Sequence, residues 1–136
     1  MILVIRISGL VEMLSGMNET LFRMHLRKKY SAILLKETEE NRNILQLIRN
    51  FVAYGPIDKA TLELLISKRA KSLDKKRVDY KRVAEIIESE GIDKAGIKPF
   101  FRLHPPRGGI KSKIHFPKGV LGDNKEKINE LVRRML

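Results

Sequence analysis

Basic side chains on a loop rich in glycine and proline offer the clearest chemistry in this sequence. Residues 99–119 read PFFRLHPPRGGIKSKIHFPKG, and no acidic residue occurs in the wider segment 94–122. Cations that no neighbouring carboxylate offsets bind phosphate groups. Gly108 and Gly109 let the backbone approach a bulky partner closely. This loop is therefore predicted to bind phosphates. Its candidate contacts are Arg102, His104, Arg107, Gly108, Gly109, Lys111, Lys113, His115 and Lys118.

Two further basic runs lie outside this loop. A helix predicted from Asn18 to about Lys29 would place Arg23 and Arg27 on one face, four residues apart. These cations either contact phosphate or stabilise the negative end of the helix dipole. Residues 66–82 hold eight Lys or Arg against two Asp, and the alternative there is a solvated surface. The candidate contacts from both runs are Arg23, Arg27, Lys28, Lys29, Lys68 and Arg69.

The aromatic and histidine side chains of the loop have competing interpretations. Phe100, Phe101 and Phe116 either stack on unpaired bases or, for at least one of the first two, anchor the loop in the core. His104 and His115 have no cysteine in the chain and no carboxylate in the loop to complete a metal site. Neither has the nucleophile and oxyanion site that a general base needs. The sequence predicts no metal, no cofactor and no catalytic residue.

Positive charge is concentrated in the second half of the chain. The 136 residues have a net charge of +12. Residues 1–65 carry 9 basic and 7 acidic side chains, whereas residues 66–136 carry 19 and 9. The absence of cysteine excludes a disulfide scaffold, and no apolar run approaches the roughly 20 residues that span a membrane. We expect a cytoplasmic protein that binds nucleic acid, with an acidic membrane surface as a distant alternative and no small-molecule substrate.

The elements that would position these residues begin with a small sheet. Residues 2–7, 31–36 and 51–54 are short apolar runs typical of strands. The helix from Asn18 and a second helix capped by Thr38 separate them. Residues 1–56 are therefore predicted to form a β-α-β-α-β core, with both helices on one side of the sheet.

Residues 57–136 are predicted to form a mainly helical extension of this core. Asp58 and Asp79 are placed to cap two helices, and a capping-box pattern at Asp123 predicts the start of the last one. A short strand is expected at residues 100–103. The basic loop at residues 99–122 has too many glycines and prolines for a helix interior or a central strand.

Several stretches resemble one known family. Residues 51–55 (FVAYG), 60–70 (ATLELLISKRA) and above all 102–109 (RLHPPRGG) are similar to the large-subunit ribosomal protein L-thirty family in its archaeal form, related to the eukaryotic ribosomal protein L-seven. Residues 4–13 and 34–55 fit that family in order and spacing. The resemblance implies an α+β, ferredoxin-like core with a three-stranded antiparallel sheet, followed by the extension of archaeal and eukaryotic members.

The resemblance implies a structural constituent of the large ribosomal subunit, not an enzyme. Its expected partners are large-subunit rRNA, which it would bind and stabilise, and neighbouring large-subunit ribosomal proteins. Residues 71–98 carry no recognisable family string, so their charge argument stands alone. The main alternative is a free-standing RNA-binding regulator, which would need contacts to base edges. An enzyme on the same core would need a pocket with a histidine or carboxylate of shifted pKa.

Overall fold

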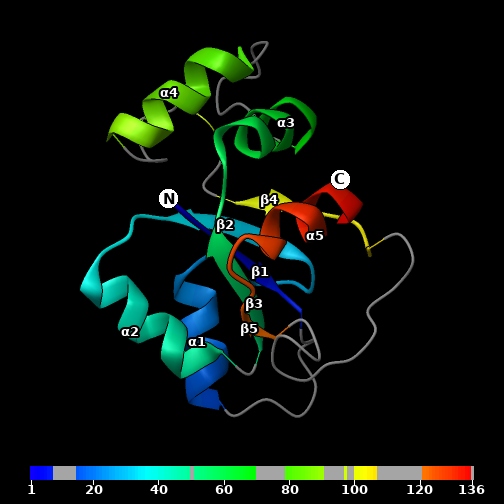
Figure 1. Ribbon diagram of the computed structural model, residues 1–136. Helices are drawn as coiled ribbons and strands as arrows, with labels where there is room; N and C mark the ends of the chain where they lie inside the picture. The colour runs from blue at the N-terminus through cyan, green and yellow to red at the C-terminus, as the bar shows by residue number, and fades with distance from the viewer. Residues whose placement is uncertain are drawn as a thin grey trace.

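A five-stranded sheet between two helical layers forms the described part of the computed structural model (Figure 1). The structure describes residues 1–7, 15–49, 51–69, 79–90, 97, 100–106 and 121–135. The strand order is β4-β2-β1-β3-β5. None of the helices in this part combines the length and apolar character needed to cross a membrane.

The three central strands are the ones that the apolar runs predict. They are β1 (Ile2–Arg6), β2 (Ser31–Leu35) and β3 (Val52–Pro56), and β1 pairs antiparallel with both neighbours. Helix α1 (Ser15–Arg23) joins the first pair and α2 (Glu39–Ile48) joins β2 to β3. The predicted β-α-β-α-β order is confirmed, and the fold is an α+β fold of the ferredoxin-like kind.

Helices α1 and α2 cover one face of this sheet, as expected from one apolar stripe on each (Figure 1). Thr38 caps α2, because its hydroxyl accepts a hydrogen bond from the backbone N–H of Asn41 at 3.2 Å. Alternate strand residues point into this layer. The buried cluster comprises Ile2, Val4, Leu21, Leu26, Ile33, Leu45, Ile48 and Val52.

The second face is covered by α3 (Lys59–Arg69), α4 (Tyr80–Glu90) and α5 (Lys127–Met135). Asp58 caps α3 as predicted, since its Oδ1 accepts from the backbone N–H of Thr61 at 2.7 Å. Helix α4 packs on α3, and α5 packs on both α3 and β3. The predicted apolar stripe of the last helix is confirmed, with Ile128, Leu131, Val132 and Met135 buried.

Two short strands from residues 57–136 widen the predicted three-stranded sheet to five. Strand β4 (Phe101–Arg102) pairs antiparallel with β2, and β5 (Gly122–Asp123) pairs parallel with β3. Their pairing satisfies backbone groups that the outer strands of a three-stranded sheet would leave unpaired. The strand expected at residues 100–103 is confirmed. The division of the chain at residue 56 stays a prediction.

The start of the last helix differs from its prediction. Asp123 lies in β5, and its Oδ1 accepts from the backbone N–H of Lys125 at 2.9 Å. A turn at Lys125, which has a positive φ of 51°, precedes the first helical residue, Lys127. The capping-box pattern therefore marks a strand and its turn, because pairing with β3 holds Asp123 extended.

Candidate nucleic-acid interface

The basic run after α1 does not continue that helix, which ends at Arg23. The prediction of a helix from Asn18 to about Lys29, with Arg23 and Arg27 on one face, is wrong at both ends, since α1 spans Ser15–Arg23. His25 adopts a left-handed conformation with φ of 64°. A histidine in this conformation is uncommon, and it reverses the chain where glycine usually does so.

The hydrogen bonds of this turn form a Schellman motif. The N–H of His25 donates to the carbonyl of Phe22 at 3.1 Å, and the N–H of Leu26 donates to the carbonyl of Leu21 at 2.9 Å. Leu21 and Leu26 are fully buried in the same cluster, which is the apolar contact that accompanies this motif. Arg27, Lys28 and Lys29 therefore lie on an exposed connection between the helix end and β2.

The buried residue Arg6 holds this connection in place through hydrogen bonds of its side chain and its backbone. Arg6 is fully buried at the end of β1, and its Nη1 donates to the carbonyl of Leu26 at 2.6 Å. Its own backbone carbonyl accepts from the N–H of Tyr30 at 2.7 Å. Burial lowers the pKa of the Arg6 guanidinium, because desolvation disfavours the charged form. Arg6 thus holds both ends of the segment that carries Arg27, Lys28 and Lys29.

Strand β4 brings the start of the basic loop to the same place. Arg102 pairs with Ser31 across the antiparallel register, and the N–H of Leu103 donates to the carbonyl of Tyr30 at 3.0 Å. The backbone N–H of His104 donates to the carbonyl of Met135 at 3.2 Å. We call the resulting surface the basic edge. It consists of Arg27, Lys28, Lys29, Arg102 and His104.

Three cations in this region lie over aromatic rings. The distances from the cation to the ring centroid are 5.3 Å for Arg27 over Phe22, 5.1 Å for Lys29 over Tyr30 and 5.5 Å for Arg102 over Phe100. Such contacts restrict the motion of the cation, while its polar hydrogens stay available for hydrogen bonds. Phe101 is fully buried, which confirms the expectation that one of the two phenylalanines belongs to the core, and Phe100 is partly buried.

The remaining predicted contacts do not join the basic edge. Arg23 forms an exposed ion pair with Glu19 at 2.7 Å, one turn back on α1. Lys68 and Arg69 lie in the last turn of α3, in the helical layer on the other face of the sheet. Seven predicted residues lie outside the described part of the chain: Arg107, Gly108, Gly109, Lys111, Lys113, His115 and Lys118.

Archaeal proteins of known family resemble this chain over almost their whole length. The large ribosomal subunit protein uL30 of Archaeoglobus fulgidus is 35% identical, over 99% of this chain and 99% of its own. Proteins of the same name from Aeropyrum pernix and Saccharolobus solfataricus are each 33% identical, over 98% of this chain. They are matched over 97% and 96% of their own lengths. The chain belongs to the uL30 family. No family model matches it.

Membership in the uL30 family confirms the resemblance that rests on residues 51–55, 60–70 and 102–109. Two features of this uL30 chain escaped the sequence analysis. One is Arg6, because a charged residue at the end of an apolar strand gives no signal of being buried. The other is the last turn of α5, where Arg133 and Arg134 precede the Met135 carbonyl that contacts His104.

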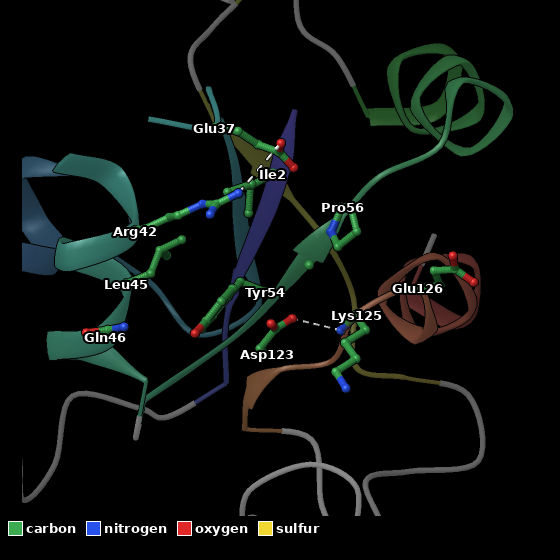
Figure 2. A pocket seen from close by; sticks show the side chains of 11 residues that line it. Ile2, Glu37, Arg42, Leu45, Gln46, Tyr54, Pro56, Asp123, Lys125 and Glu126 are labelled. Atoms are coloured by element: carbon green, nitrogen blue, oxygen red, sulfur yellow. Dashed lines mark hydrogen bonds and ion pairs between the residues drawn. The ribbon is translucent and has the colours of Figure 1, made fainter. Parts of the chain in front are cut away.

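A groove of about 510 Å³ lies near the opposite edge of the uL30 sheet, between α2, β3 and the turn before α5 (Figure 2). Three of its charged side chains, Glu37, Arg42 and Asp123, have partners within the protein. Arg42 lies 4.0 Å from Glu37, and Asp123 accepts from the backbone of Lys125. Burial, and then the charge of Asp123, raises the pKa of the Tyr54 hydroxyl. The groove has no histidine in its lining, and the described residues hold no cluster that could bind a metal ion.

Proposed function

We propose that this chain is a structural constituent of the large ribosomal subunit, where it binds and stabilises folded rRNA in the cytoplasm and supports translation. Family membership supports the ribosomal part of this proposal. The observation that carries the rRNA part is the β2–β4 register, which joins two basic segments more than 70 residues apart into the basic edge. Such a concentrated cationic surface is the electrostatic footprint of a protein that binds nucleic acid.

The basic edge would act mainly by neutralising phosphates. Each Lys or Arg that meets a phosphate releases condensed counterions, so it adds about 0.7–0.9 to the salt dependence of binding. Arg107, Lys111, Lys113 and Lys118 follow Pro106 in the sequence, and we propose that they bind phosphates as well. Neutralisation of this kind would let rRNA segments pack closely together. It requires no catalytic group, and the chain acts as a scaffold and not as an enzyme.

The test combines sedimentation with a pair of matched double variants. Lys28→Ala with Lys29→Ala removes two charges from the basic edge, whereas Lys59→Ala with Lys81→Ala removes two exposed charges from α3 and α4. Each variant replaces the native protein in cells, and extracts are run on sucrose gradients of increasing salt. We expect the control to stay with the large subunit and the basic-edge variant to dissociate at lower salt.

Two results would contradict this proposal. Equal retention of both double variants at every salt concentration would show that the basic edge does not bind rRNA. Native protein that stays at the top of the gradient would instead favour a free-standing RNA-binding regulator. In that case crosslinking from the basic edge would identify its own RNA targets.

A further inference from the structure

An exposed phenylalanine lies at the border of the basic edge. Phe22, on the last turn of α1, keeps 45% of its surface exposed although the guanidinium of Arg27 lies 5.3 Å from its ring centroid. Single exposed apolar side chains are common on protein surfaces, but this ring differs because a guanidinium lies over it and the cations of the basic edge adjoin it. Phosphate neutralisation alone needs no ring at this place.

The fold holds this pair of side chains in position before any partner binds. The Schellman motif at His25 turns the chain so that Arg27 comes back over the last turn of α1. Leu26, the residue before Arg27, is fully buried, and its carbonyl accepts from Arg6. The backbone on which Arg27 sits is thereby fixed. A site that is arranged in advance loses less conformational entropy on binding.

A second pair of the same kind lies on the same side of the sheet. The guanidinium of Arg102 lies 5.5 Å from the Phe100 centroid, and Phe100 packs against the cluster that contains Leu21 and Leu26. Of the three cation–ring pairs in this region two use arginine, whose planar guanidinium stacks on flat π systems in a way that the ammonium of Lys29 over Tyr30 does not. The repetition favours a partner with flat rings as well as phosphates.

We propose that Phe22 and Arg27 form a stacking site for an unpaired RNA base. The inference rests on the proposed rRNA binding and names the feature of the RNA that this part of the edge recognises. A bulged or looped-out base presents a π face that stacks on an aromatic ring or a guanidinium plane. Lys28 and Lys29, next along the chain, would bind the phosphates that flank this base.

The test compares two RNA hairpins, one fully paired and one that carries a single bulged adenosine. Arg27→Lys keeps the charge but removes the guanidinium plane, and Phe22→Ala removes the ring. Leu47→Ala is the matched control, because Leu47 is an exposed apolar residue on α2 with 61% of its surface accessible. Thermal unfolding confirms that each variant folds. A fluorescent adenine analogue at the bulge reports stacking directly.

Wild-type protein is expected to prefer the bulged hairpin and to quench the analogue. Arg27→Lys and Phe22→Ala are expected to weaken binding of the bulged hairpin by about 5- to 150-fold, the range for stacking of one base. For Arg27→Lys, which keeps the charge, the loss of affinity for the bulged hairpin should exceed any loss for the paired hairpin. Leu47→Ala should behave as wild type.

The two proposals fail in different ways. If wild-type protein binds both hairpins with a steep salt dependence but Arg27→Lys and Phe22→Ala lose nothing at the bulge, the stacking site is wrong. The exposed ring would then be a surface that a neighbouring protein covers. If wild-type protein binds neither hairpin nor large-subunit rRNA at low salt, the proposed rRNA binding itself is wrong.

Discussion

At one edge of the sheet β4 pairs with β2, and at the other edge β5 pairs with β3; both added strands have two residues. Strand β4 places Arg102 beside the exposed run of Arg27, Lys28 and Lys29. Strand β5 places Asp123 beside Tyr54 and leads into the turn before α5. Adding a two-residue strand thus produces a cationic surface at one edge of the sheet. At the other edge it produces a surface with both acidic and basic side chains, which we call the mixed-charge edge.

The difference lies in what each cation contacts. Arg42, near the second edge, faces the carboxylate of Glu37, whereas Arg27 and Arg102 lie over aromatic rings. A carboxylate offsets the charge that would attract a phosphate, but a ring leaves that charge and its hydrogen-bond donors in place. The edge that we propose to bind RNA is therefore the one at which two arginines lie over rings, and not the one at which an arginine faces a carboxylate.

The largest effect is expected from Gly55→Ala, at the mixed-charge edge. A Cβ on Gly55 would meet the carbonyl oxygen of Lys125 and lie 3.0 Å from Cγ2 of Ile128. Because the backbone must shift, we expect a loss of about 3 kcal/mol in the free energy of unfolding, the upper end for overpacking. Urea denaturation measures it. If the two edges are independent, RNA affinity per folded molecule will not change.

The second largest effect on the free energy of unfolding is expected from Arg6→Met, because Arg6 is buried next to the basic edge. The variant removes the bond to the buried carbonyl of Leu26, and we expect a loss of about 2 kcal/mol in the free energy of unfolding. RNA affinity should fall as well, because the segment with Arg27 and Lys29 loses its support. Arg42→Met is the control: its exposed ion pair contributes less than about 1 kcal/mol. Similar losses of stability and of affinity for both variants would contradict the comparison.

A smaller effect is expected at Asp58, the cap of α3. The hydroxyl and the backbone N–H of Thr61 lower the pKa of the Asp58 carboxyl below its usual value. The hydroxyl oxygen of Thr61 is buried and has no hydrogen-bond partner among the described residues. The hydrogen bond from the backbone N–H of Thr61, at 2.7 Å, is therefore the stronger cause of the lowered pKa. A lowered pKa means that this stabilisation is present above the unfolded value of 3.8 and is lost as pH falls through the folded pKa.

Asp58→Ala is therefore expected to lower the free energy of unfolding by about 1 kcal/mol at neutral pH. Asp58→Asn keeps an acceptor for the N–H of Thr61 and should lose less. It should also remove the contribution of this group to acid sensitivity. Thermal unfolding between pH 2 and pH 7, a range that brackets the carboxyl titration, measures both effects. An unchanged acid dependence in Asp58→Asn would show that this carboxyl is not responsible.

The smallest effect is expected at His25, and it has the opposite sign. Glycine adopts the left-handed conformation of this residue without steric cost, so His25→Gly should raise the free energy of unfolding by about 0.5–1 kcal/mol. The basic edge should keep its RNA affinity, since the Schellman bonds use only backbone atoms. A destabilised variant would show that the imidazole itself contributes to this turn.

Much of the fold follows from local patterns in the sequence. The apolar runs predict β1, β2 and β3, and the caps Thr38 and Asp58 predict where α2 and α3 begin. These signals are local, because a strand pattern or a cap depends on residues within one or two turns. The end of α1 could not be predicted in this way, since no glycine marks the reversal at His25.

For the candidate site, too, the sequence predicts some features and leaves others to the tertiary structure. The sequence alone determined which residues carry the charge, that the RLHPPRGG string belongs with one family, and that residues 1–56 follow the order β-α-β-α-β. Only the tertiary structure decided that Arg102 lies beside Ser31, that Arg6 is buried under Leu26, and that Arg23 stands apart in an ion pair. The reason is physical: strand pairing joins residues far apart in the chain, and its register depends on the packing of both sheet faces and not on any local pattern.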